Sequence, residues 1–284
     1  MYIGNNKTNV LVIGAPRSGT TLLAGLLSAG KEASQMLPEC TFITQIIQQF
    51  HNIRHYSDPQ RFAAYAIDEP TLAGMYRGLV DSMLATVRSH FEGIDYRYLI
   101  LKDPELSQLI DWIPLFFGQY SKTVCVVRDP RAVIASMLKI ERKKKCDLWS
   151  AWKKTPNRFI ANDLVNQVFR ERRLMSDFFM YYWRVQDSQL LKRGAAHMVS
   201  FEKIMAHDED EFKKLEVYLG FAIGREGFGK VHFDFDRADP TFSAGYGKKI
   251  QETSTDFRTI LTHRQVRKIK AAYSGLNETY GWWK

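Results

Sequence analysis

Runs of apolar residues without polar alternation recur along the chain and predict buried strands. The first is residues 10–13, where every residue is apolar and three of the four are β-branched. A strand that is apolar on both faces is typical of a parallel sheet covered by helices on both sides. Runs rich in apolar residues at 96–101, 123–127 and 197–201 predict further strands.

Between these runs the apolar residues recur three or four positions apart, which predicts helices. The first helix is predicted after a short loop that follows the first strand, because the leucines of residues 22–27 have this spacing. Further helices are expected at 42–50, 71–91, 105–117 with a break at Pro114, 130–139, 162–191, 209–219 and 262–276. Residues 142–154, which are basic and contain two tryptophans, are expected to be irregular or mobile, and residues 233–255 lack strong periodicity.

The alternation of strands and helices predicts an α/β fold. We expect a P-loop-like three-layer arrangement, with a central parallel sheet flanked by helices and right-handed crossovers. The sequence has no internal repeat and no low-complexity linker. Residues 1–284 are therefore expected to form a single domain.

The loop after the first strand has the features of an anion-binding site. A loop from strand to helix that is bounded by Gly14 and Gly19 directs backbone N–H groups, and the positive end of the helix dipole, at one place. These glycines keep the spacing of the kinase-type pattern G-x-x-x-x-G-K-[ST], but Thr20 stands at the position of the lysine. A cation occurs instead within the loop, at Arg17. The loop is predicted to bind a phosphate-like group without the lysine on which nucleoside triphosphate chemistry relies.

A second anion site is predicted beside the first. Ligands of parallel α/β sheets bind beyond the carboxyl ends of the strands, where Lys102 and Asp103 follow the second predicted strand and Arg128 follows the third. Ser136 lies eight residues after Arg128, about two helical turns, on roughly the same side. Arg128 can bind a phosphate with two N–H groups, and Ser136 can add a hydroxyl. Two such sites indicate a nucleotide that carries a 5′ anion and a separate ribose phosphate.

Composition adds modest constraints. The net charge of +9 fits an anionic ligand, nucleic acid or a membrane surface without choosing among them. Cys40, Cys125 and Cys146 are far apart and form no C-x-x-C pair, so neither a zinc site nor a disulfide framework is expected. No signal-peptide pattern precedes the first strand and no apolar run is as long as a membrane span, so a cytoplasmic protein is expected.

These motifs together resemble those of sulfotransferases that use 3′-phosphoadenosine 5′-phosphosulfate (PAPS). Residues 14–21 resemble the 5′-phosphosulfate loop of that superfamily, and residues 128–131 followed by Ser136 resemble its 3′-phosphate motif. Residues 199–204 and 218–221 resemble its later strand and helix. The resemblance spans roughly residues 8 to 220. Arg17 within the loop, together with Lys102-Asp103-Pro104, is most similar to the tyrosylprotein sulfotransferase-like branch.

The resemblance implies in-line transfer of a sulfuryl group to an acceptor hydroxyl, in which the enzyme mainly positions the group and neutralises charge. Arg17 and Lys102 would stabilise the developing charge, so that no metal ion is required. The acceptor would be a small molecule, a glycan or another hydroxyl compound, rather than nucleic acid. The residues implied to bind the donor are Arg17, Ser18, Gly19, Thr20, Thr21, Arg128, Ser136, Lys248 and Lys249.

A general base is needed to take the proton of the acceptor hydroxyl. The resemblance implies a glutamate shortly after the first helix, for which Glu39 is the candidate, although an alignment without a shift puts Cys40 there. His51, His55 and Asp103 remain alternatives, and Asp103 is also suited to cap the following helix. The arginines that read acidic peptides in the tyrosylprotein branch are missing after Glu39, which disfavours a protein-tyrosine acceptor.

Two other functions remain open from the sequence. A P-loop-type kinase for a small molecule or nucleotide is disfavoured by Thr20 in place of the lysine. A non-catalytic nucleotide-binding or scaffold protein would bind the nucleotide without turnover. The sequence does not specify an oligomeric state.

Overall fold

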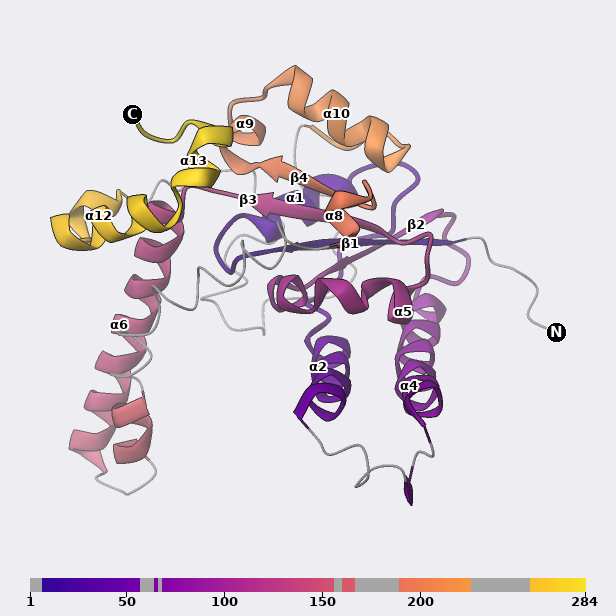
Figure 1. The fold of residues 1–284 in the computed structure, drawn as a ribbon, viewed down its shortest axis with the longest axis horizontal. Helices are drawn as coiled ribbons and strands as arrows, with labels where there is room; N and C mark the ends of the chain where they lie inside the picture. The colour runs from indigo at the N-terminus through magenta and orange to yellow at the C-terminus, as the bar shows by residue number, and fades with distance from the viewer. Residues whose placement is uncertain (1–6, 57–63, 66–67, 156–159, 167–188, 226–255) are drawn as a thin grey trace.

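A computed structural model describes residues 7–56, 64–65, 68–155, 160–166, 189–225 and 256–284. The described residues form a four-stranded sheet in the order β2–β1–β3–β4, in which every neighbouring pair is parallel (Figure 1). The strands are β1 (Thr8–Gly14), β2 (Tyr98–Lys102), β3 (Lys122–Val127) and β4 (Ala196–Ser200). All the predicted strands and the predicted α/β class are thereby confirmed.

The strands are buried on both faces, as their unbroken apolar character predicts. In β1, Leu11 and Ile13 belong to one apolar cluster and Val10 and Val12 to another on the opposite face, because successive side chains of a strand point to opposite sides. One face is covered by α1 (Thr20–Ser28) and α10 (Glu209–Leu219), and the other by α2 (Thr41–Tyr56), α4 (Glu69–Ser89), η1 (Pro104–Trp112) and α5 (Ile113–Phe117) (Figure 1). The helices and the sheet therefore form the expected three layers.

The predicted helix at 105–117 is interrupted, as its proline predicts. A 3-10 helix ends at Trp112, and α5 begins at Ile113 with Pro114 in its first turn. Proline is tolerated there because its missing N–H has no partner within the helix at that position. The predicted break near Pro114 is therefore confirmed.

The helix after β3 is much longer than predicted. α6 (Pro130–Lys154) continues through residues 142–154, so the prediction of an irregular or mobile segment there is wrong. These residues contain neither Gly nor Pro, and nothing in them ends a helix. Figure 1 shows α6 extending well away from the sheet, which explains why its distal half lacks the apolar periodicity of a packed helix.

The last part of the chain packs at the end of β3. It comprises η3 (Phe257–Thr259), α12 (His263–Ala272) and α13 (Ser274–Tyr280), whose apolar residues join those of α6 and Val127 in one cluster. The single helix predicted at 262–276 is thus two helices. Tyr273 separates them with a backbone conformation outside the helical region (φ −115°, ψ 22°).

A segment that the sequence analysis left unassigned runs along the edge of β2. Residues 32–40 follow this strand in parallel: Ala33 pairs with Tyr98 and Glu39 with Lys102. The Ser34 hydroxyl also accepts the N–H of Ile100 at 3.0 Å. This edge segment (residues 32–40) delivers Glu39 to the tip of β2, where the predicted site lies.

The remaining elements are short. They are α8 (Gln189–Lys192), α9 (Phe201–Met205) and a helical stretch at 160–166. The ends of the long helix predicted at 162–191 are thus helical, and its middle lies outside the described residues, as does all of 233–255. In the part of the chain that is described, no helix combines the length and the apolar character needed to cross a bilayer.

Candidate functional site

The loop between β1 and α1 is built so tightly that only glycine fits at its two ends. Gly14 has φ +145°, and a Cβ atom there would lie 2.6 Å from the carbonyl oxygen of Val126. Gly19 has φ +107°, and a Cβ atom there would overlap the ring of Phe201. Arg17 also adopts the left-handed region, with φ +71°, which is uncommon for a residue other than glycine. Strain of this kind is characteristic of ligand-binding loops.

The N-terminus of α1 is open to an anion. No side chain caps this helix, and its first turn contains no acidic residue. The hydroxyl of Ser18 is buried and has no hydrogen-bond partner among the described residues. A buried polar group without a partner costs free energy, and the positive end of a helix dipole attracts negative charge. Both features favour an anion in the loop.

The two predicted anion sites are in direct contact. The Nε of Arg17 donates to Oγ of Ser136 at 3.2 Å, and Nη1 of Arg128 donates to the carbonyl oxygen of Arg17 at 3.1 Å. The guanidinium of Arg128 lies 4.1 Å from the centre of the Phe201 ring, the same ring that contacts Gly19. The loop and the segment after β3 therefore form one cationic surface.

Burial makes the guanidinium of Arg17 receptive to an anion. Loss of hydration lowers the pKa of Arg17 from its ordinary value, and the negative charge of Glu39 acts in the opposite direction. A desolvated cation gains more from a nearby negative charge than a hydrated one does. Arg17 is thus placed to interact with an anionic ligand.

Lys102 connects the loop to the candidate base. Its ammonium lies 2.7 Å from Oε1 of Glu39 and donates to Oγ1 of Thr21 at 3.0 Å. The Lys102 side chain is only 2% exposed, whereas that of Glu39 is 36% exposed. The edge segment holds this pair in place, since the N–H of Cys40 donates to the carbonyl oxygen of Lys102 at 3.0 Å.

The Cys40 alternative is less suited to the base position. The carboxylate of Glu39 contacts the Lys102 ammonium, whereas burial raises the pKa of the Cys40 thiol and keeps it protonated. A protonated, desolvated thiol is a poor proton acceptor. The geometry thus favours Glu39 over Cys40.

Asp103 has a structural task. Its carboxylate accepts the Thr44 hydroxyl at 2.6 Å and the backbone N–H of Glu105 at 3.0 Å, so it caps η1 and fixes the start of α2. The suggestion that Asp103 caps the following helix is confirmed. Burial raises the pKa of Asp103, and the hydrogen bond from Thr44 acts in the opposite direction.

The two candidate histidines lie farther along α2. Nδ1 of His51 accepts the indole N–H of Trp112 at 3.0 Å, and the His51 and His55 rings are 4.4 Å apart. His51 is ten residues beyond Thr41, the first residue of α2, which corresponds to roughly 15 Å along the helix axis. Neither histidine is brought into the group formed by Lys102, Glu39 and Thr21.

Two predicted donor-binding residues, Lys248 and Lys249, lie outside the described residues. In the described ranges no group of three or more His, Cys, Asp or Glu side chains is arranged to hold a metal ion.

The residue that the sequence analysis overlooked is Phe201, whose ring packs against both Gly19 and the Arg128 guanidinium. It follows β4, and no local pattern distinguishes it from a core aromatic residue.

The fold defines an α/β protein with a P-loop-like loop at the carboxyl end of its central strand β1. A model of the sulfotransferase family matches residues 9–224, and the chain therefore belongs to that family and is a sulfotransferase. The kinase alternative is not favoured. The match is to the family as a whole, and the similarity to the tyrosylprotein branch stays a prediction.

Two solved structures share the fold. The sulfotransferase domain of the Synechococcus PCC 7002 olefin synthase is 16% identical, with a TM-score of 0.54 and coverage of 99% of this chain and 98% of that chain. The sulfotransferase domain from the curacin biosynthetic pathway is 15% identical, with a TM-score of 0.56 and coverage of 94% of this chain and 98% of that chain. No curated protein sequence gives a match.

The packing of Gly19 against Phe201 can be tested by substitution. Gly19→Ala is expected to lower the free energy of unfolding by about 2–4 kcal/mol, because the methyl group overlaps the ring and φ is unfavourable. Gly74→Ala is the matched control: Gly74 lies within α4 with open space around its Cα, so alanine should stabilise the helix by about 0.5–1 kcal/mol. Urea unfolding measures both, and equal stability of the two variants would contradict the tight loop.

Proposed function

We propose that the protein transfers the sulfuryl group of PAPS to the hydroxyl group of an acceptor. The observation that supports this most directly is the meeting of Arg17, Ser136 and Arg128 at the ends of β1 and β3. A nucleotide with anionic groups at both its 5′ and 3′ positions matches two adjoining cationic sites. A nucleotide with a single phosphate chain would use only one of them.

The residues present fit such a donor. On the 5′ side, the buried Ser18 hydroxyl without a partner and the uncapped start of α1 both favour a negative acceptor. On the 3′ side, Arg128 and Ser136 supply N–H and O–H donors. The residues proposed to hold the 5′ group are Arg17, Ser18, Gly19, Thr20 and Thr21. When bound, PAPS supplies a sulfuryl group that is activated by its anhydride link to phosphate.

Arg17 and Lys102 are proposed to stabilise the charge that develops during transfer. Charge builds on the oxygen that links the departing nucleotide to sulfur, and fixed cations aimed at that place lower the barrier. Lys102 is buried and is held by Thr21 at the mouth of the loop. Its ammonium therefore needs little reorganisation when the charge appears.

Glu39 is proposed as the general base. Its carboxylate is partly exposed beside Lys102, so an acceptor hydroxyl can approach it from solvent. Glu39 takes the hydroxyl proton as the acceptor oxygen bonds to sulfur and the bond from sulfur to the nucleotide breaks.

The surface next to Glu39 favours an acceptor with an apolar or aromatic part. Phe42 lies three residues after Glu39, in the first turn of α2, and is 76% exposed. An exposed aromatic ring can stack on a sugar or a phenol. A sugar, phenol or lipid-like hydroxyl compound is accordingly the acceptor class proposed.

Removing the proposed 3′-phosphate ligand should weaken donor binding. Arg128→Ala is expected to lower the affinity for adenosine 3′,5′-bisphosphate by about tenfold to a hundredfold, because charge-assisted hydrogen bonds are lost. Affinity for adenosine 5′-monophosphate, which has no 3′-phosphate, should change far less. Calorimetric titration measures both.

Arg77→Ala is the control for this experiment, since Arg77 is exposed on α4 and pairs with Asp81. It removes the same charge far from the strand ends. If Arg128→Ala and Arg77→Ala bind the bisphosphate equally well, the 3′-phosphate assignment is wrong.

Removing the proposed base should affect turnover and spare binding. Glu39→Gln preserves size and can still accept from Lys102, but it cannot take a proton, so kcat should fall by about 10²- to 10⁴-fold. The bisphosphate affinity should stay close to that of the wild type. Glu32→Gln, at an exposed carboxylate near the start of the edge segment, is the control and should retain activity. Near-normal turnover of Glu39→Gln would transfer the role to His51, His55 or Asp103.

A further inference from the structure

The C-terminal end of the described chain is joined to the residues that directly follow Arg128. The Nη2 of Arg131 donates to the carbonyl oxygen of Trp282 at 2.8 Å. The Arg131 guanidinium also lies between two aromatic rings, 4.6 Å from the centre of Phe257 and 4.7 Å from that of Trp283. Residues 256–284 lie beyond the family match, which ends at residue 224. A segment outside the matched region thus contacts the proposed 3′-phosphate site.

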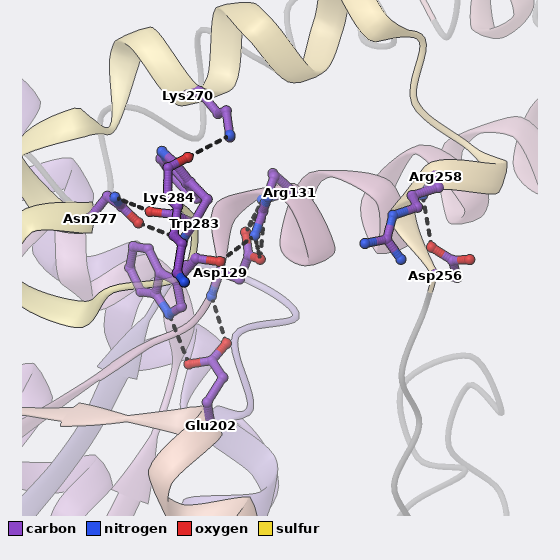
Figure 2. A network of polar contacts seen from close by, with 10 residues as sticks. Asp129, Arg131, Glu202, Asp256, Arg258, Lys270, Asn277, Trp283 and Lys284 are labelled. Carbon is purple, nitrogen blue, oxygen red and sulfur yellow. Dashed lines mark hydrogen bonds and ion pairs between the residues drawn. The ribbon is translucent and has the colours of Figure 1, made fainter.

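Asp129 and Glu202 complete this connection, as Figure 2 shows. Asp129 pairs with Arg131 through a two-point contact whose shortest distance is 2.7 Å, and both side chains are largely buried. The backbone N–H of Asp129 donates to Oε1 of Glu202 at 2.8 Å. The other carboxylate oxygen of Glu202 accepts the indole N–H of Trp282 at 3.1 Å. Trp282 therefore holds Glu202, and Glu202 holds the backbone at the residue next to Arg128.

Glu202 is also adjacent to Phe201, the ring on which Arg128 lies. Both residues belong to the first turn of α9. Trp282 is thus linked to Arg128 in two ways. Glu202 binds the backbone N–H of Asp129, the residue after Arg128, and Glu202 also adjoins Phe201, whose ring contacts the Arg128 guanidinium. The Trp282 side chain itself is fixed by stacking on Tyr280, with ring centres 5.1 Å apart, and the neighbouring Trp283 exchanges two hydrogen bonds with Asn277.

We propose that Trp282 is a positioning residue for the donor: through Glu202 it sets the orientation of Arg128, and so determines affinity for the ribose 3′-phosphate. This inference rests on the proposed function, because it assumes that Arg128 binds that phosphate. Trp282 does not touch the donor in this scheme. Its effect is therefore specific for ligands that carry a 3′-phosphate.

The test compares two nucleotides that differ only in that group. Trp282→Phe keeps an aromatic ring that can stack on Tyr280 but loses the N–H donor to Glu202. It should weaken binding of adenosine 3′,5′-bisphosphate by about fivefold and leave binding of adenosine 5′-monophosphate unchanged. Glu202→Gln has a single acceptor oxygen and cannot accept from both Asp129 and Trp282 as the two carboxylate oxygens do, so it should have the same selective effect. With PAPS as substrate, KM for the donor should rise while kcat changes little.

Trp112→Phe is the matched control, because it also loses one indole hydrogen bond, to His51, in a different apolar cluster from that of Trp282. It should alter the affinity for neither nucleotide. In an Arg128→Ala background, Trp282→Phe should cause no further loss of bisphosphate affinity, since its effect passes through Arg128.

The outcomes separate this inference from the function on which it rests. Suppose that the wild type prefers the bisphosphate and that Arg128→Ala abolishes this preference. If Trp282→Phe then lowers the affinity for both nucleotides equally, or for neither, the positioning role is wrong and the proposed function stands. If the wild type does not distinguish the two nucleotides, both the 3′-phosphate site and the positioning role fail.

Discussion

Two arginines meet at the carboxyl ends of the strands, although like charges repel: Arg17 lies in the loop after β1, and Arg128 follows β3. The Arg128 guanidinium donates to the backbone carbonyl of Arg17 and is thereby fixed by the loop. The Arg17 guanidinium donates to Ser136 and is thereby fixed by α6, the helix that begins two residues after Arg128. Burial removes much of the hydration of Arg17, and the cost of keeping a desolvated cation next to another falls when an anion binds. The glycines, the uncapped helix and the unpartnered Ser18 hydroxyl are consistent with the same requirement for negative charge.

The register of the parallel sheet determines how this cationic surface relates to the rest of the site. β1 is a central strand: Val12 pairs with Lys102 on one side, and Gly14 pairs with Val126 on the other. The loop after β1 therefore lies between the tips of β2 and β3. Lys102 and Glu39 stand on the β2 side, and Arg128 stands on the β3 side. The proposed catalytic pair and the proposed 3′-phosphate ligand are thus separated by the loop that would hold the 5′ group.

The sequence predicted the sheet and the loop well, because both have local signals. Strands buried on both faces are unbroken apolar runs, and a loop with glycines five positions apart is recognisable by itself. The position of Glu39 is different. It depends on the edge segment, which pairs with β2 at isolated points and leaves no periodic pattern. The contact of Trp282 with Glu202 joins residues 80 positions apart, and the local sequence around neither residue predicts it.

The errors in the helices have a related cause. The distal half of α6 has no apolar stripe because it extends away from the sheet. The sequence signal for a helix there is intrinsic propensity and local contacts such as the stacking of Trp149 on Trp152, which are weaker signals than periodicity. The break at Tyr273 follows from packing against α6 and the end of β3, where Tyr273 is buried in the same apolar cluster as Val127. Such tertiary effects override a continuous helical pattern.

The most direct measurement is calorimetric titration of the wild-type protein with adenosine 3′,5′-bisphosphate, in parallel with ATP and magnesium. Tight binding of the bisphosphate and weak binding of ATP are expected, because the two cationic sites suit two separate anionic groups and the loop lacks the P-loop lysine. Tight binding of ATP with magnesium and weak binding of the bisphosphate would contradict the assignment of Arg128 and Ser136 and would support phosphoryl transfer instead.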